Sequence, residues 1–198
     1  MIDLEDLAAP FNQDQISWRV GSTNAKKVRA ETGNQKAHAT KGIALAYIDA
    51  RDVMERLDQV CGPANWQDKY SHAGNRVVCD IGIKIDGEWV WKANGAGDTQ
   101  VEADKGALSD AFKRAAVMWG VGRYLYSIEN KWVDLAPFGR IKDDQYSILN
   151  ASHKKAADFA EWGSPAERAM LKGYLHTCLL YTSPSPRDRT RSRMPSSA

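Results

Sequence analysis

Alternating hydrophobic and polar residues predict a three-stranded meander in the middle of the chain. In residues 76–85, every second position is apolar, which is the period of a strand with one buried face. The Asp86-Gly87 dipeptide that follows is a strong signal for a two-residue hairpin turn. With residues 66–71 before this strand and 88–94 after it, we expect three consecutive antiparallel strands.

Trp89 and Trp91 fall on one face of the third expected strand. Large aromatic side chains that share one face of a strand usually bury much apolar surface. We therefore expect this pair to belong to the core rather than to form a platform for a ligand.

A long helix is predicted over residues 102–119, and it has two different faces. At about 100° per residue, one arc collects apolar side chains and the other collects polar and charged ones. Gly120 and Gly122 are expected to end the helix, because glycine adopts the left-handed conformation of a helix C-terminus without strain. The apolar arc contains Ala107, Leu108, Ala111, Phe112, Ala115, Met118 and Trp119, and the other arc contains Ser109, Asp110, Lys113, Arg114 and Val117.

The flanking segments are shorter and less regular. Ile16, Trp18 and Val20 alternate as in a strand, and residues 43–48 form a compact apolar run that also predicts a strand. Asp49 can cap a helix that extends to Val60. Between the first two strands, residues 21–42 are polar and are expected to form an exposed loop or hairpin. Downstream, residues 132–138 are expected to be irregular, 143–162 helical, and 164–167 the start of another helix.

The order strand, helix, three-stranded antiparallel meander and long helix predicts an α+β fold, with helices on one face of the sheet. The length of 198 residues and the apolar fraction of 43% suit one core-forming domain. No apolar run approaches the ~20 residues of a membrane span, and the acidic N-terminus lacks the features of a signal peptide. We expect a cytoplasmic protein with no membrane partner.

Residues 178–198 differ from the rest of the chain, because serine, proline and arginine dominate and periodicity is lost. The segment resembles the translation of a transposase-type sequencing adapter, so we expect a non-native tail and a natural chain that continues beyond Thr177. Without the tail, Lys+Arg falls from 27 to 23 and Asp+Glu from 25 to 24, and the net charge moves from +2 to −1. Only a local basic patch can then support nucleic-acid binding.

The most basic local window is residues 21–42, where six cationic or titratable side chains face a single Glu31. A basic loop of this kind can contact phosphates, and a merely solvated loop is an equally good interpretation. The residues are Lys26, Lys27, Arg29, Lys36, His38 and Lys41.

The sequence contains no strong motif for nucleotide binding, metal binding or catalysis. The Gly95-x-Gly97 spacing alone is poor evidence for phosphate binding, and no P-loop motif occurs, so ATP hydrolysis is not expected. Cys61 and Cys79 lack zinc-type spacing and are expected to be reduced, partly buried thiols. The four histidines, His38, His72, His153 and His176, are too scattered to predict a metal site or a catalytic triad.

Several short motifs follow one another between residues 43 and 126. The most specific is the Lys113-Arg114-Ala115 run with Trp119-Gly120 one turn later. The others are Tyr47-Ile48-Asp49-Ala50-Arg51, Cys61-Gly62, Trp66 and Gly95-Ala96-Gly97. In this order, the motifs resemble the N-terminal domain of the Rad52 family of single-strand annealing proteins, including phage and prophage relatives such as Sak.

The resemblance implies ATP-independent binding and annealing of single-stranded DNA in homologous recombination and double-strand break repair, by an oligomeric ring that is not an enzyme and needs no cofactor or metal. It implies that Lys113 and Arg114 line the DNA groove with Arg51, and that Val117 replaces a basic residue of the family. We expect Lys36, Lys41 and Arg123 as secondary contacts.

The resemblance further implies a setting and an order of segments. The setting is the nucleoid of a bacterial or phage-infected cell, with a single-strand binding protein or an exonuclease as protein partner. The expected division is an N-terminal segment with the basic loop (1–42), the annealing core (43–135), a truncated helical extension (136–177) and the tail (178–198).

Three other interpretations remain open at the level of sequence. A double-stranded RNA-binding module also runs helix, three strands, helix. A metal-dependent nuclease could use Asp80, Asp98, Glu102 or Asp104 with Lys105. An oligomeric scaffold that binds no nucleic acid is the third.

Overall fold

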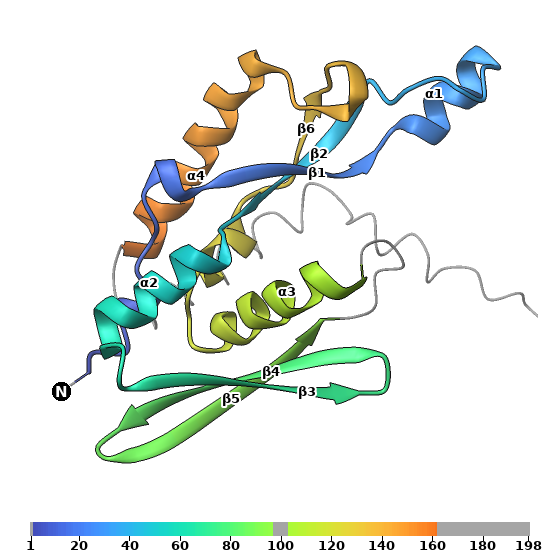
Figure 1. Ribbon diagram of the computed structural model, residues 1–198. Coiled ribbons are helices and arrows are strands. Elements are labelled where there is room, and N and C mark those ends of the chain that lie inside the picture. The colour runs from blue at the N-terminus through green and yellow to red at the C-terminus, as the bar shows by residue number, and fades with distance from the viewer. Residues whose placement is uncertain (1, 97–102, 162–198) are drawn as a thin grey trace, which may run out of the picture. The chain divides into compact units, whose positions relative to one another are not determined.

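The computed structural model describes residues 2–96 and 103–161, all within the unit Met1–Glu161. Two three-stranded antiparallel sheets form there, with strand orders β1-β2-β6 and β3-β4-β5 (Figure 1). The α+β class is thus confirmed, but the expected single sheet is wrong, because the strand over 43–48 joins a different sheet from the meander. Gly97 of the Gly95-x-Gly97 motif, the helix start predicted at 164–167 and the tail lie outside the described residues.

The meander is formed as predicted by β3 (Trp66–Ala73), β4 (Arg76–Ile85) and β5 (Glu88–Ala96). The β4–β5 turn has positive φ at Asp86 (50°) and at Gly87 (90°), as a two-residue hairpin of this type requires. The buried face of β4 carries Cys79, Ile81 and Ile83, each fully buried. The alternation in the sequence therefore identified the core face of this sheet.

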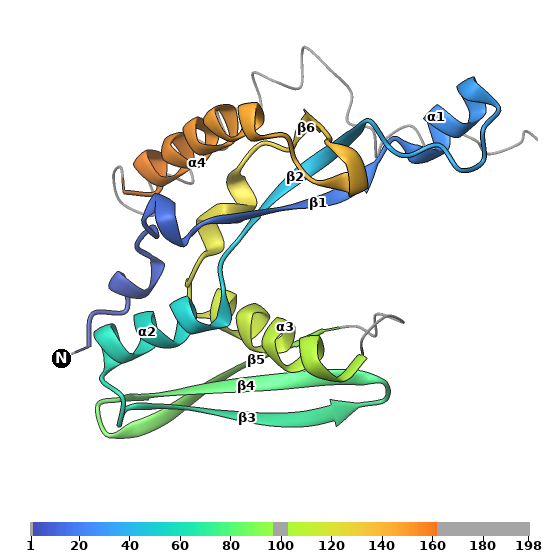
Figure 2. The same ribbon diagram turned by 45° about the horizontal axis from the view of Figure 1, so that its top comes forward.

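Helix α3 (Ala103–Met118) lies on that face of the meander (Figure 1; Figure 2). Ala111, Phe112 and Ala115 are buried in one cluster with the β4 residues, as predicted. Leu108 and Met118 are corrections, because they are 46% and 44% exposed at the margins of the apolar arc. The buried stripe is narrower than the helical wheel suggested.

The C-terminus of α3 is closed by glycines, as expected. Gly120 has a φ of 104° and Gly122 a φ of 65°, both in the region that favours glycine. A Cβ at Gly120 would lie 3.1 Å from Ala8 Cβ, so close packing also favours glycine there. The indole Nε1 of Trp119 donates to the Ile81 carbonyl at 3.0 Å and fixes the helix end on β4.

The expectation that Trp89 and Trp91 are core residues is wrong. The register pairs Gly82 with Trp91 and Lys84 with Trp89, so both rings lie on the face of the meander opposite Ile81 and Ile83. Trp89 is 38% exposed. The strongly apolar face of β4 decides which side of the sheet receives α3, and β5 must follow it.

The second sheet contains β1 (Ser17–Thr23), β2 (Lys41–Tyr47) and β6 (Lys131–Asp134). The predicted strand around Trp18 is confirmed. The polar window between β1 and β2 also contains a helix, α1 (Ala25–Thr32), instead of only a loop, and β6 falls in a segment expected to be irregular. Both elements were missed because α1 buries no residue and β6 has only four.

Two further helices complete the described fold. Helix α2 (Ala50–Cys61) begins after Asp49, whose backbone N–H donates to the Asp52 carboxylate at 3.0 Å, and buries Val53 and Leu57 as predicted. Helix α4 (Tyr146–Glu161) packs on the second sheet through Leu149, which shares a cluster with Ala44 and Val133. No described helix is long and apolar enough to cross a membrane.

Short 3-10 helices join these elements and place the N-terminal segment against α2. They are η1 (Asp6–Ala8), η2 (Gln13–Gln15), η3 (Arg123–Ser127), η4 (Pro137–Gly139) and η5 (Asp143–Gln145). The guanidinium of Arg56 donates to the carbonyls of Asp6, Ala9 and Pro10. The chain before β1 is thereby tied to the core that supports α3.

Candidate nucleic-acid interface

A groove of about 520 Å³ separates β2 from the exposed side of α3 and the turn that follows it. Three of its lining side chains are cationic: Arg19 from β1, and Lys113 and Arg114 from α3. Asp110 contributes one carboxylate, and Tyr47 and Tyr126 contribute aromatic rings. Cations with interspersed aromatics are the combination that binds the backbone and bases of a single nucleic-acid strand. We call this site the groove.

Helix α3 places Lys113 and Arg114 because its opposite side is fixed in the core. With Phe112 and Ala115 buried, the 3.6-residue period turns the intervening pair toward the groove. The Lys113 ammonium lies 5.7 Å from the centroid of the Tyr47 ring, within the range of a cation–π contact. Two predicted site residues are therefore together in one cavity, on a rigid element.

Arg114 is held by an acidic neighbour. Its Nε donates to Asp110 Oδ2 at 3.0 Å, and the two side chains are 49% and 50% exposed. The hydrogen bond that Arg114 donates to Asp110 raises the pKa of Arg114, and the negative charge of Asp110 is the next cause, so the guanidinium is always charged. Asp110 fixes the orientation of the arginine but also removes one unit of positive charge from the groove.

Arg19 is the site residue that sequence reasoning missed. In β1, Trp18 and Val20 pack against the cluster under α4, so Arg19 points to the other face of the sheet. It pairs with Leu45 across the sheet and lines the groove. The alternation around Trp18 already contained this signal, because a lone arginine between two inward positions must face outward.

Val117, which stands where the resemblance implied a basic residue, does line the groove. Arg123 lies nearby, but its guanidinium is used at the end of α3: Nε and Nη2 donate to the Val117 carbonyl at 3.0 and 2.8 Å, and Nη2 also donates to the Met118 carbonyl at 3.0 Å. These bonds satisfy carbonyls that a helix C-terminus leaves open. Arg123 therefore has a structural role whether or not it touches DNA.

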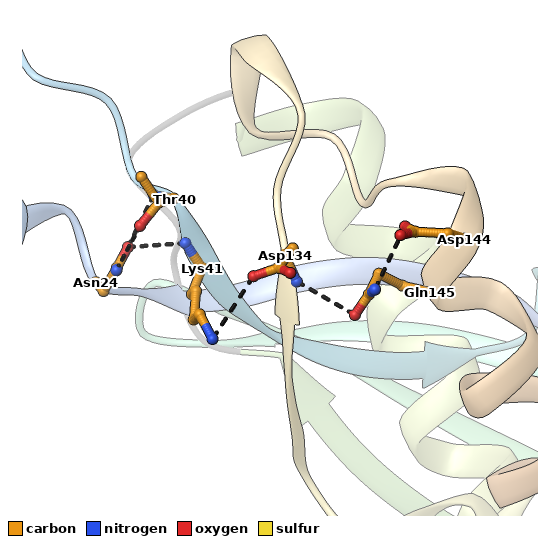
Figure 3. Close-up of polar contacts among 6 residues, drawn as sticks. All are labelled: Asn24, Thr40, Lys41, Asp134, Asp144 and Gln145. Atoms are coloured by element: carbon orange, nitrogen blue, oxygen red, sulfur yellow. Dashed lines mark hydrogen bonds and ion pairs between the residues drawn. The ribbon is translucent and has the colours of Figure 1, made fainter.

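Lys41 lies at the start of β2, in a polar network that anchors α1 (Figure 3). Its backbone N–H donates to Asn24 Oδ1 at 2.9 Å, as does that of Thr40 at 3.0 Å. Its ammonium lies 3.6 Å from Asp134 on β6. Gln145 in turn accepts from the Asp134 N–H at 3.4 Å. The charge of Lys41 is thus partly compensated by a carboxylate.

The remaining two predicted contacts, Arg51 and Lys36, lie outside the groove lining, as Lys41 and Arg123 do. Arg51 is exposed in the first turn of α2, three residues after Ile48, which does line the groove. Lys36 is exposed beyond α1, and its backbone N–H donates to Asn34 Oδ1 at 2.9 Å. We call residues 24–40, with α1 at their centre, the arm; both views show α1 beyond the ends of β1 and β2 (Figure 1; Figure 2).

Nothing among residues 2–96 and 103–161 groups three His, Cys, Asp or Glu side chains for a metal ion. Of the nuclease candidates, Asp80 is described, whereas Asp98, Glu102 and the side chains of Asp104 and Lys105 lie outside the described part. His153 is buried, and its ring nitrogens contact the Tyr124 hydroxyl and Gln13 Oε1 at 2.9 and 2.7 Å. Its contacts indicate a packing role.

Both described cysteines are free, and they are buried where only partial burial was expected. Burial raises the pKa of the Cys61 thiol, and it raises that of Cys79 to about 11. A protonated thiol is a poor nucleophile and a poor metal ligand. These thiols therefore act as apolar core side chains at neutral pH.

Two curated proteins are similar to about two thirds of this chain. The chain is 34% identical over 130 residues to the single-stranded DNA-binding protein DdrA of Deinococcus radiodurans, covering 65% of this chain and 56% of that protein. It is also 34% identical over 129 residues to the DdrA of Deinococcus deserti, covering 64% and 58%. The chain thus spans little more than half the length of these relatives.

Residues 4–137 match the family described as Rad52/22 family double-strand break repair protein. The matched region runs from before η1 to η4, and so contains both sheets and every residue of the groove. It also contains the helix, three strands and helix that left the double-stranded RNA-binding module open as an interpretation. The chain belongs to the Rad52/22 family of double-strand break repair proteins.

Proposed function

We propose that this protein binds single-stranded DNA and, without ATP, anneals complementary strands in homologous recombination and double-strand break repair. The observation that carries the proposal is the convergence of Arg19, Lys113 and Arg114 on one groove. The family membership and the relatives named as single-stranded DNA-binding proteins support the same function. The relatives' names alone would not assign a site.

Annealing requires no bond to be made or broken in the protein or the DNA. It requires that phosphate repulsion be reduced and that one strand be held with its bases free to pair. Cations on α3 and β1 can hold the sugar–phosphate backbone in the groove, and Tyr126, 74% exposed, can guide a base at its margin. In this proposal Arg51, expected as a principal contact, becomes a secondary one because it does not line the groove. Lys36, Lys41 and Arg123 are the other secondary contacts along the path of the strand.

Three cations bind a strand weakly at physiological salt, so the proposal includes an oligomer. Copies arranged in a ring would align their grooves, and each added copy would contribute further phosphate contacts to one continuous strand. The net charge of −1 without residues 178–198 is then no obstacle, because the cations are concentrated in one place. We place this activity at bacterial or phage DNA, with a single-strand binding protein or an exonuclease supplying the strands.

The test is the annealing of two complementary labelled oligonucleotides by the full chain, without ATP or magnesium. We expect the unaltered protein to accelerate annealing and the Lys113→Ala/Arg114→Ala variant to lose most of the acceleration. The matched control is Lys154→Ala/Lys155→Ala, which removes two adjacent exposed cations from α4 and should anneal like the unaltered protein.

Two further checks make the result decisive. A chain ending at Thr177 lacks the four arginines beyond residue 178, and we expect it to anneal like the full chain. Circular dichroism and light scattering establish that the groove variant is folded and assembled like its parent. Equal annealing by the two double variants would refute the groove as the DNA site.

A further inference from the structure

A chain of buried hydrogen bonds joins η3, α4 and the segment before β1. The Phe11 N–H donates to the Tyr124 hydroxyl at 3.1 Å, and that hydroxyl lies 2.9 Å from Nε2 of His153. Nδ1 of His153 lies 2.7 Å from Gln13 Oε1, and the Gln13 amide donates to Asn150 Oδ1 at 3.0 Å. One polar path therefore connects three parts of the chain that are far apart in sequence.

The partners in this path fix which nitrogen of the imidazole carries the hydrogen. Because the side-chain nitrogen of Gln13 donates to Asn150, its oxygen faces His153 and can only accept, so Nδ1 must be the donor. Nε2 then accepts from the Tyr124 hydroxyl, whose oxygen accepts from the Phe11 N–H. Every donor meets an acceptor only while the imidazole is neutral.

A second proton on His153 would break the path. It would place an N–H donor on Nε2, opposite a hydroxyl that already accepts from Phe11, so the hydroxyl hydrogen of Tyr124 would lose its acceptor. Tyr124 is 8% exposed and His153 is 3% exposed, which leaves little water to receive either group. Protonation of His153 therefore favours separation of η3 from α4.

Burial of His153 also determines the pH at which the path is stable. Burial lowers the pKa of His153 below its ordinary value of 6.5, and none of the described carboxylates forms an ion pair with the imidazole. The stability that the path contributes is therefore complete above pH 6.5 and is lost as the pH falls below it. The charged side chains on the elements around His153 are Lys154, Asp158 and Glu161 on α4, Asp14 on η2, Arg123 on η3 and Arg56 on α2.

The path reaches the groove through η3. Tyr124 packs in the core, whereas its neighbours Leu125 and Tyr126 line the groove. The Ser127 hydroxyl donates to the Tyr124 carbonyl at 2.6 Å, so the last residue of η3 is also tied to Tyr124. The position of Tyr124 thus sets where two groove residues lie relative to the cations of α3.

We propose that Tyr124 and His153 are positioning residues for the groove, and that protonation of His153 releases η3 and weakens the binding of single-stranded DNA at acidic pH. Packing alone does not require a path of polar groups, because apolar side chains fill a core without the cost of burying donors and acceptors. The inference rests on the proposed function, since it assigns a pH dependence to the same groove.

The first test uses no DNA. Hydrogen exchange of the full chain, followed by mass spectrometry of the peptide that contains Phe11, measures how often the path opens. After correction for the intrinsic effect of pH, protection should decrease by about five-fold or more between pH 7.5 and pH 5.5, because the open form binds the proton more tightly. His153→Gln should show no such decrease, since glutamine does not titrate. His72→Gln, which removes an exposed histidine from β3, should behave like the parent.

The second test measures affinity for a labelled oligothymidylate at the same two pH values by fluorescence anisotropy. Relative to His153→Gln, the parent and His72→Gln should lose about two-fold or more in affinity at pH 5.5. Tyr124→Phe should weaken binding by about three-fold at pH 7.5, because the Phe11 N–H loses its acceptor. Tyr146→Phe, which alters an exposed tyrosine at the start of α4, should bind like the parent.

The two measurements separate failure of this inference from failure of the proposed function. An equal pH course in the parent and in His153→Gln would overturn the inference, and so would lost protection with unchanged DNA affinity. Constant protection in the parent would overturn it even if His153→Gln did not fold. Absence of DNA binding by the parent at pH 7.5 would refute the proposed function and with it the pH dependence of binding, whereas the exchange data would still show whether the path opens.

Discussion

The groove and the arm both gather cations, but they hold them in opposite ways. In the groove, Lys113 is half-buried beside Tyr47, and Arg114 is fixed by Asp110. In the arm, α1 buries no residue, and the Lys27 side chain is 75% exposed with a 3.7 Å contact to Glu31. The richer basic window of the sequence is therefore the less organised of the two.

We infer from this difference that DNA affinity depends more on where the cations are held than on how many there are. An exposed lysine on a solvated helix is screened by salt and loses side-chain entropy when it binds. A lysine between a helix and a sheet has already lost part of that freedom, and its field is less screened. We therefore expect DNA affinity to depend on groove cations far more than on arm cations.

The largest effect should come from reversing one charge in each region. Lys113→Glu should weaken binding of single-stranded DNA by about ten-fold or more, because it removes a phosphate contact and adds repulsion in a confined site. Lys27→Glu should change affinity by less than about three-fold, since its field is screened by water and salt. Equilibrium binding to a labelled strand at a fixed salt concentration measures both. Similar losses would show that the two regions contribute alike.

An intermediate effect is expected from Arg19, which joins the groove from the second sheet. Arg19→Gln should weaken binding by a few-fold and reduce the salt slope by about 0.7, the contribution of one phosphate contact on a single strand. Arg140→Gln removes an exposed arginine outside the groove and should leave the slope unchanged. A slope that is identical in both variants would exclude Arg19 from the interface.

The smallest effect, and the one of opposite sign, should come from Asp110. Asp110→Asn removes a negative charge from the groove and frees Arg114, so affinity should increase by about two-fold at low salt. The exposed i,i+4 pair contributes only about 0.3–0.5 kcal/mol to stability, so the melting temperature should barely change. Weaker DNA binding by this variant would mean that orienting Arg114 outweighs the charge.

Local patterns predicted the elements that depend on local sequence. The meander, α3 and the pair Lys113 and Arg114 follow from alternation and helical period, which operate over a few residues. The second sheet could not be predicted in this way, because β2 pairs with β6 from about 90 residues later in the chain, and only four residue pairs join them. That sheet forms the second wall of the groove, so the sequence could not predict all of the residues that line it.

Trp89 illustrates a different limit of sequence reasoning. Judged from β5 alone, the tryptophan face is the more apolar one and should be buried. The register with β4 decides otherwise. Ile81 and Ile83 face the core, and because they pair with Lys92 and Val90, these two residues of β5 must face the core as well. Lys92 is accommodated there by its ammonium, 4.1 Å from the Trp119 ring centroid and 3.2 Å from the Met118 carbonyl.

The most direct test of the central claim is the salt dependence of single-stranded DNA affinity for the unaltered chain, Lys113→Ala/Arg114→Ala and Lys154→Ala/Lys155→Ala. If Lys113 and Arg114 each neutralise a phosphate, the slope of log affinity against log salt should decrease in magnitude by about 1.4 in the groove variant alone. Three parallel lines would contradict the account, because DNA would then release the same number of ions without the groove cations.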